Sequence, residues 1–229
     1  MSFYVLVEGK TEKKVYPRWI SLLLPPFDCV PTIEDITQVN HYCLESFYGY
    51  SLLPDSLERG VEKIKANNVK IDYFVVILDS EEECISVIEN KFRLLTESFN
   101  SLSFKFKLII QPISIEAWFL GNRKIFPSTI NAILRECLQF YDTRNKDPEL
   151  IPILNSALSN QHSTRARFYK FYLKNIANLK TSGNLSYKPP FLNFVMPNEY
   201  LPEIKKRSTE KNDMIYFKKM CDFFEQLNF

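Results

Sequence analysis

A run of large apolar residues followed at once by acids, YFVVILDSEEE at residues 73–83, is the most informative stretch of the chain. Its apolar part, Tyr73–Leu78, is rich in β-branched residues and does not alternate, which is typical of a strand buried on both faces of a parallel sheet. Similar runs occur at Phe3–Val7 and Phe104–Gln111, and helical patterns separate the three. Strands that alternate with helices predict βαβ units, so we expect an α/β fold with a mainly parallel sheet covered on both faces.

The remaining elements follow from periodicity and from the positions of Pro and Gly. In the first half we expect a helix from Thr11 to about Leu24 with a kink at Pro17, a strand near Ile36–Tyr42, a helix over Asp55–Asn67, a helix from the acids to about Phe99 and a short helix from Glu116 to Leu120. Later helices are expected at Thr129–Tyr141, Glu149–Leu158, Ser163–Leu179 and Asp213–Leu227, with a long loop over residues 181–202. The pattern changes near Ile125 from alternating strands and helices to helices alone. This change predicts an α/β domain, residues 1–124, and a helical, basic subdomain, residues 125–229.

The composition is that of a globule with a sizeable core. Of 229 residues, 45% are hydrophobic and 24% charged, which excludes a disordered tail, a collagen-like fibre and a coiled coil. No apolar run reaches about 18 residues, so we expect no spanning helix and no membrane partner. The five cysteines lie far apart without a CxxC pair, which argues against a zinc knuckle and a disulfide framework and fits a reduced, cytoplasmic location.

Charge is distributed unevenly along the chain. Residues 1–122 carry 17 acids and 12 bases, whereas residues 123–229 carry 10 acids and 17 bases. The acid-free window between Glu149 and Glu199 contains Arg165, Arg167, Lys170, Lys174, Lys180 and Lys188, interleaved with Phe168, Tyr169, Phe171, Tyr172 and Tyr187. Bases with aromatics are typical of surfaces that follow phosphates and stack on bases, so the first four bases are candidate nucleic-acid-binding residues. The alternative is a solvated basic helix whose aromatic face belongs to the core.

Three apolar strands each lead into carboxylates. Glu8 follows the first, Asp79 and Glu81 follow the second, and Glu116 begins the helix after the third. Ligands of open parallel sheets bind at the carboxyl ends of the strands, so we expect Glu8, Asp79 and Glu116 to converge at one edge. Converging like charges need neutralisation, and Mg²⁺ prefers a few carboxylates together with water and phosphate oxygens. The pattern therefore predicts a divalent-cation site that orients a water against a phosphodiester.

Each acid also has a structural alternative. Glu8 can bind the turn at Gly9, and Glu116 can cap its own helix. Acids in a first helical turn stabilise the helix dipole whatever the function, which is the alternative for Glu82 and Glu83 and the favoured interpretation of Glu12. His41 and His162 are isolated, so each is interpreted as a surface or core histidine rather than as a ligand.

These motifs resemble those of the Toprim superfamily, in which Glu–Gly ends the first strand and Asp-x-Asp ends a later one. The matching residues are VEGKTE at 7–12 and DSE at 79–81. The tracts VEGKTEKKVYPRW and ISIEAWFLGN further resemble small bacterial Toprim-like proteins found beside ABC-type or SMC-like ATPases in phage-defence loci, which are akin to the nuclease half of the overcoming-lysogenization-defect enzymes. The resemblance covers about residues 3–122.

The resemblance implies a Rossmann-like Toprim sheet with a metal-dependent nuclease site. Glu8 would be the general acid/base or a metal ligand, and Asp79 and Glu81 would hold Mg²⁺, with Mn²⁺ as an alternative. Glu83 and Glu116 would complete the metal cluster. Glu81 departs from the family pattern, which has Asp there, and the longer side chain puts the position of the ion, and activity itself, in question.

Two hypotheses about function remain. The first is a Mg²⁺-dependent nuclease that hydrolyses DNA or RNA, held by the basic helical part, and that serves as the toxic effector of an anti-phage defence system. The second is a non-catalytic Toprim-like module that binds an ATPase partner, favoured by the substitution at Glu81 and by the many aromatic residues. A nucleotide-binding Rossmann protein is disfavoured because the chain has neither GxGxxG nor GxxxxGK[ST].

Overall fold

The computed structural model describes residues 1–181, 194–195 and 198–227. The chain forms two compact units: the first contains Met1–Leu78, Glu83–Ile110 and Met220–Phe229, and the second contains Asp79–Glu82 and Gln111–Lys219. The division falls inside two strands and one helix, and it does not coincide with the boundary expected near residue 125. None of the helices in the described part of the chain is long and apolar enough to cross a membrane.

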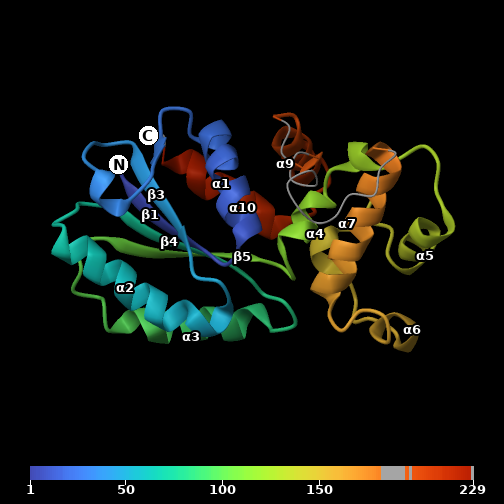
Figure 1. Ribbon diagram of the computed structural model, residues 1–229, viewed down its shortest axis with the longest axis horizontal. Helices are drawn as coiled ribbons and strands as arrows, with labels where there is room; N and C mark the ends of the chain where they lie inside the picture. Colours follow the sequence, from blue (N-terminus) through green and yellow to red (C-terminus); the bar gives the residue numbers. More distant parts are fainter. Residues whose placement is uncertain (182–193, 196–197, 228–229) are drawn as a thin grey trace. The chain divides into compact units, whose positions relative to one another are not determined.

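A five-stranded parallel sheet forms the centre of the first unit (Figure 1). The strands are β1 (Phe3–Val7), β2 (Asp28–Val30), β3 (His41–Ser46), β4 (Tyr73–Asp79) and β5 (Lys105–Gln111), in the order β2-β3-β1-β4-β5. The central strand β1 pairs with β3 in the register Val7↔Ser46 and with β4 in the register Val7↔Ile77. All five residues of β1 are buried, as expected of a strand covered on both faces. The predicted α/β fold with a mainly parallel sheet and a helical C-terminal part is therefore confirmed.

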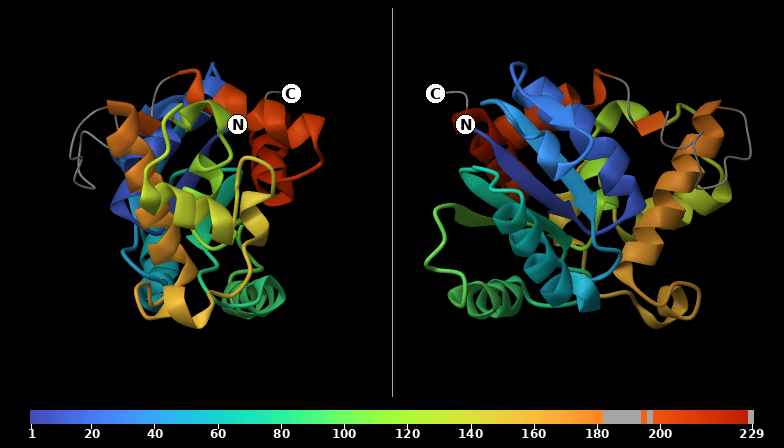
Figure 2. Two further views of the ribbon diagram at one scale, coloured as in Figure 1. Left: turned by 90° about the vertical axis from the view of Figure 1, so that its right-hand side faces the viewer. Right: turned by 60° about the vertical axis from the view of Figure 1, so that its left-hand side comes forward.

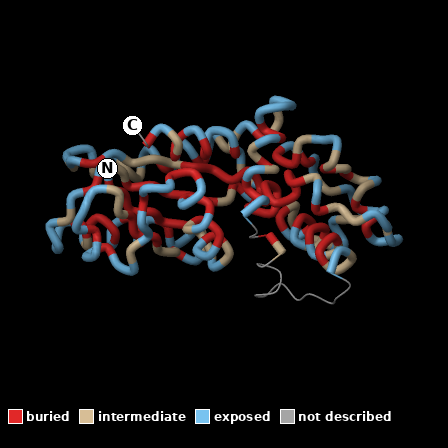
Figure 3. Tube along the Cα trace, turned by 90° about the horizontal axis from the view of Figure 1, so that it is seen from above, coloured by how far each residue is buried: buried red, intermediate tan, exposed pale blue. Residues whose placement is uncertain are grey.

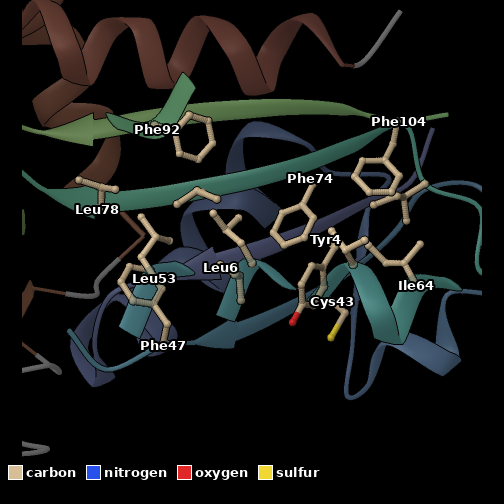
Figure 4. Packing of buried hydrophobic residues seen from close by; sticks show 14 of the residues in the cluster. Tyr4, Leu6, Cys43, Phe47, Leu53, Ile64, Phe74, Leu78, Phe92 and Phe104 are labelled. Carbon is tan, nitrogen blue, oxygen red and sulfur yellow. The ribbon is translucent and has the colours of Figure 1, made fainter. Parts of the chain in front are cut away.

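Helices cover both faces of the sheet. On one face, α2 (Leu53–Ala66) and α3 (Ile85–Glu97) pack against alternate strand residues such as Tyr4, Leu6 and Phe74, several of which Figure 4 shows. On the other face lie α1 (Lys10–Leu23) and the end of α10 (Ile215–Gln226). There the ring of Phe224 lies 6.1 Å from that of Phe3, between ring centroids. The period of two along each strand thus divides the aromatic residues between two cores.

Gly60 allows α2 to approach the sheet closely. A Cβ at this position would lie 2.7 Å from Phe74 Cζ and 3.0 Å from Tyr4 Cε1, closer than van der Waals contact allows. Both rings belong to adjacent strands, β4 and β1, and stack edge to face with their centroids 5.0 Å apart. A helix with a side chain here would have to move away from the sheet.

The second unit is built around α7 (Arg165–Thr181). Its inward face is apolar and fully buried, and α4 (Ile115–Phe119) lies beside it (α7 is orange in Figure 2). The other described helices of this unit are α5 (Ala132–Phe140), α6 (Ser156–Ser159), α9 (Tyr200–Glu210) and the first turns of α10. Buried positions recur along the helices of each unit, as Figure 3 shows.

Several predicted elements need correction. The strand expected near Ile36–Tyr42 is β3, which begins only at His41, and β2 was not predicted because Asp28–Val30 is short and largely exposed. No continuous helix spans Glu149–Leu158: Pro152 lacks the N–H that a helix needs, and only a 3₁₀ turn at Pro148–Leu150 and the short α6 form. The predicted loop over 181–202 lies mostly outside the described residues, together with Tyr187 and Lys188, and its last residues are helical because α9 begins at Tyr200.

Candidate functional site

The chain reverses its direction of winding between β1 and β4. From β1 it continues to β2 on one side of the sheet, and from β4 it continues to β5 on the other side. Such a switch point is where open α/β sheets bind ligands, beyond the carboxyl ends of the strands. Glu8 directly follows β1 and Asp79 is the last residue of β4, so both acids are carried by this pair of strands. Glu8 belongs to the first unit and Asp79 to the second.

In the first unit, the charge of Glu8 acts on the hydroxyl of Tyr50. Burial raises the pKa of the Tyr50 hydroxyl, the charge of Lys91 opposes this rise, and the charges of Glu83 and Glu8 add to it. Glu83 Oε1 forms an ion pair with Lys91 Nζ at 2.5 Å, and that ammonium lies 5.7 Å from the Tyr50 ring centroid. Glu83, a predicted metal ligand, therefore already has a cationic partner.

Gly9, in the VEGKTE tract at 7–12, makes room for Glu12 of the same tract. The side chain of Glu12 is buried, and a Cβ on Gly9 would lie 2.7 Å from Glu12 Oε2. Gly9 itself is the N-cap residue of α1. Glu12 thus lies over the start of its helix, in agreement with its interpretation as a first-turn acid.

In the second unit, the turn Asp79–Glu82 is held against the segment after β5. Ser80 N donates to Gln111 O at 2.9 Å, Glu81 N donates to Ile113 O at 3.0 Å, and Ile113 N donates to Ser80 Oγ at 2.8 Å. Both turns contain a strained residue, because Glu81 has φ +47° and the β-branched Ile113 has φ +67°. Residues held in this region cluster at functional sites, where the surrounding structure maintains the strain.

The left-handed Glu81 also corrects a prediction. The acids Glu81, Glu82 and Glu83 do not lie in the first turn of a helix, since α3 begins only at Ile85. A residue with positive φ cannot continue a right-handed helix. Stabilisation of the α3 dipole from within its first turn is therefore not the role of these acids.

Polar side chains are buried where the segment after β5 faces this turn. Gln111 and Ser114 have no exposed surface, Glu116 is 1% exposed, and Ser80 is 6% exposed. The bond from Lys105 N to Asp72 O, at 3.0 Å, and that from Ser80 N to Gln111 O keep one register along β4 and β5, in which Asp79 lies opposite Gln111. Asp79 and Gln111 therefore lie side by side at the carboxyl ends of adjacent strands.

The turn is joined directly to the basic helix α7. Glu82 accepts from Arg165 N at 2.7 Å and from Arg165 Nε at 2.8 Å, and Arg165 Nη2 donates to Glu81 O at 3.3 Å. Arg165, the first residue of α7, thus anchors the helix to the turn. Arg167, Lys170 and Lys174 lie on the exposed side of the helix.

Three of the four aromatic residues of α7 cannot form a stacking surface. Phe168, Tyr169 and Tyr172 are fully buried, and Tyr169 Oη donates to Pro148 O at 2.8 Å. The alternative interpretation, a basic helix whose aromatic face belongs to the core, therefore holds for these three residues. Arg167, Lys170 and Lys174 are exposed, and cationic side chains on a protein surface can make electrostatic contacts with phosphates.

A second buried carboxylate, Glu149, escaped the sequence analysis. It accepts from Trp118 Nε1 at 2.9 Å and from the backbone N–H groups of Tyr216 and Phe217, so it joins the IEAW tract to the first turn of α10. Burial raises the pKa of Glu149 to about 7, although these donors favour its charged form. Its position after a proline, in the 3₁₀ turn Pro148–Leu150, provided no sequence signal for this role.

The described residues contain no group of three or more His, Cys, Asp and Glu side chains placed to hold a metal ion. The predicted acids are divided between the two units: Glu8 and Glu83 belong to the first, and Asp79, Glu81 and Glu116 to the second. None of the five cysteines, all of which lie in described segments, forms a disulfide. The metal-ion site stays a prediction.

Comparison with known proteins found no matching family model, no matching curated protein and no matching solved structure. The resemblance of residues 7–12 and 79–81 to the Toprim superfamily therefore stays a prediction as well.

Proposed function

We propose that the protein is a divalent-cation-dependent nuclease that uses Asp79 at its reacting centre and the exposed bases of α7 to hold the nucleic acid. The observation that carries this proposal is the anchoring of the Asp79–Glu82 turn to Arg165, the first residue of α7. This places the acidic turn and the basic helix in one compact unit. The resemblance to Toprim-like nucleases adds the proposal that the enzyme is the effector of an anti-phage system in the cytoplasm.

The residues of the second unit suit a hard cation. Carboxylate, amide and hydroxyl oxygens are the ligands that Mg²⁺ and Mn²⁺ take in proteins, and Asp79, Glu116, Gln111 and Ser114 supply all three kinds. When bound, such a cation supplies positive charge for the phosphodiester oxygens and lowers the pKa of a bound water. Asp79 would bind the cation, and Glu116 and Glu81, of the same unit, would complete its charge neutralisation.

The decisive experiment compares Asp79→Asn with the wild type in cleavage assays on single- and double-stranded DNA and RNA, with Mg²⁺ or Mn²⁺. The substitution keeps the shape of the side chain and removes the charge that binds the cation. We expect cleavage to fall by about 10²-fold or more, a loss typical of removing one electrostatic group at a reacting centre. Asp28→Asn, at an exposed acid of β2, is the matched control and should cleave like the wild type. Equal cleavage by Asp79→Asn would refute the assignment.

The role of α7 has an independent test in binding. Replacing both Lys170 and Lys174 by Gln should weaken nucleic-acid binding and reduce the slope of log K against log [salt] by about 1.4 for a single strand, because two phosphate contacts are lost. The matched control replaces Lys206 and Lys211, two exposed lysines at the end of α9 and just beyond it, by Gln. An unchanged slope in the α7 variant would show that this face does not contact phosphates.

A binding module for an ATPase partner is the second candidate. The observation that favours it is the exposure of two large apolar residues three positions apart before α6: Leu150 is 69% and Ile153 is 83% exposed. Exposed apolar side chains that lie together can take part in a protein contact. Isothermal titration with Mg²⁺ separates the two candidates. Absence of binding at millimolar Mg²⁺ favours the module, whereas binding that Asp79→Asn abolishes favours the nuclease.

A further inference from the structure

Two buried polar side chains in the second unit have unmet hydrogen-bonding capacity. Gln111 has no exposed surface, yet neither its Oε1 nor its Nε2 has a hydrogen-bond partner within the described part of the chain, and the same holds for the Oγ of the fully buried Ser114. Buried polar groups are nearly always paired, because desolvation without a replacement bond is unfavourable. An apolar side chain of the same size would be more stable at either position, so stability alone does not account for these two residues.

Both residues lie where the strand ends carry the candidate acids. Gln111 is opposite Asp79 on the adjacent strand, and both are odd-numbered positions of their strands. Odd-numbered residues of the two strands share a sheet face, since Tyr73 of β4 and Lys107 of β5 both contact the Phe223 ring. Gln111 and Asp79 are therefore at neighbouring positions on the same face of the sheet.

Ser114 lies three residues after Gln111 in the sequence. It comes after the strained Ile113, whose N–H donates to Ser80 Oγ and whose carbonyl accepts from Glu81 N. Strained residues thus lie in both segments that meet here: Ile113 comes between the two unsatisfied polar residues in the sequence, and Glu81 lies in the turn bonded to it. Strain and unmet polar groups together are typical of a site organised for a ligand rather than for folding.

We propose that Gln111 and Ser114 are neutral oxygen ligands of a divalent cation that Asp79 binds, through Gln111 Oε1 and Ser114 Oγ. This inference rests on the proposed function, because it names further members of the same site. Amide and hydroxyl oxygens are hard donors that such cations accept beside a carboxylate. They also explain how a site with few carboxylates can bind a cation, since neutral oxygens fill positions that acids occupy elsewhere.

Direct Mn²⁺ titration of the full-length chain, followed by the electron paramagnetic resonance signal of free Mn²⁺, tests the proposal. We expect Gln111→Met and Ser114→Ala to lower Mn²⁺ affinity by about 10- to 100-fold each. In the metal-free protein the same variants should melt at the wild-type temperature or above it, because each removes an unsatisfied buried polar group. The matched control is Gln139→Met, at an exposed glutamine of α5 in the same unit.

A second variant covers the case in which Gln111→Met fails to fold. Gln111→Glu adds a carboxylate beside Asp79, so it should raise Mn²⁺ affinity and lower the melting temperature of the metal-free protein, through repulsion between the two acids. Wild-type affinity in Gln111→Met, or no gain in affinity in Gln111→Glu, overturns the inference.

The outcomes distinguish this inference from the proposed function. If the wild type binds Mn²⁺ and Asp79→Asn does not, while Gln111→Met and Ser114→Ala bind like the wild type, only the inference fails. If the wild type binds no Mn²⁺, or Asp79→Asn binds it unchanged, both proposals fail.

Discussion

Replacing the buried Glu149 by Gln should change how the stability of the protein depends on pH. Burial raises the pKa of this carboxyl from 4.5 to about 7. The folded protein therefore holds a proton on Glu149 over a pH range in which the unfolded chain has released it. By linkage, this group stabilises the fold fully below about pH 4.5, and the stabilisation is lost as the pH rises through about 7.

The magnitude follows from the size of the shift. One pKa unit corresponds to about 1.4 kcal/mol, so a rise from 4.5 to about 7 corresponds to about 3 kcal/mol between the two extremes of pH. Most of this, about 2.5 kcal/mol, falls between about pH 5 and about pH 8. The amide side chain of the variant does not titrate, and at low pH it matches the protonated carboxyl in shape and in having one carbonyl oxygen for Trp118 Nε1.

The assay is urea unfolding of the wild type and of Glu149→Gln at several pH values, followed by circular dichroism. The free energy of unfolding of the variant should rise relative to that of the wild type by about 2 to 3 kcal/mol from about pH 5 to about pH 8. Asp222→Gln, at an exposed acid of α10, is the control and should follow the wild-type profile. Parallel profiles for Glu149→Gln and the wild type would refute the assigned pKa, and a ¹³C titration of the Glu149 carboxyl would measure it directly.

Two further substitutions test the packing inside each unit, Gly60→Ala in the first and Arg207→Met in the second. Gly60→Ala should lower the free energy of unfolding by about 1 to 3 kcal/mol, because the new methyl group meets the rings of Phe74 and Tyr4. The cost of this overlap exceeds the gain of about 1 kcal/mol in helix propensity. A variant more stable than the wild type in urea would contradict the close approach of α2. Arg207→Met should lower the free energy of unfolding by about 3 to 5 kcal/mol. The buried guanidinium bonds Asp213 at 2.9 Å and three backbone carbonyls, and all of these groups would lose their partner. A loss below about 1 kcal/mol would contradict this structural role of Arg207.

Local patterns in the sequence were sufficient to predict the class of fold. The continuous apolar runs at Phe3–Val7 and Tyr73–Leu78 can be satisfied only by burial on both faces, and a parallel sheet with helices on each side provides that burial. The same patterns located α2, α7 and α10 to within a few residues. Elements without an apolar run, such as β2, were missed because their pairing rather than their composition makes them strands.

The pairing of side chains across the chain could not be predicted in this way. Spacing alone presented Glu82, Glu83 and Arg165 as members of an acidic cluster and a basic surface, but in the structure Glu82 binds Arg165 and Glu83 binds Lys91. Glu149 had no signal at all, because a carboxylate that accepts from a backbone N–H 67 residues further along the chain leaves no local pattern.

What the sequence determined by itself is which residues must be buried, since apolar periodicity acts over a few residues and the parallel sheet follows from it. Only the tertiary structure decided which charged and polar groups already have partners, and which, like Gln111 and Ser114, are buried without one among the described residues. The reason is physical: burial depends on the local pattern of side chains, whereas a hydrogen bond or an ion pair requires two groups from distant parts of the chain to meet within about 3 Å.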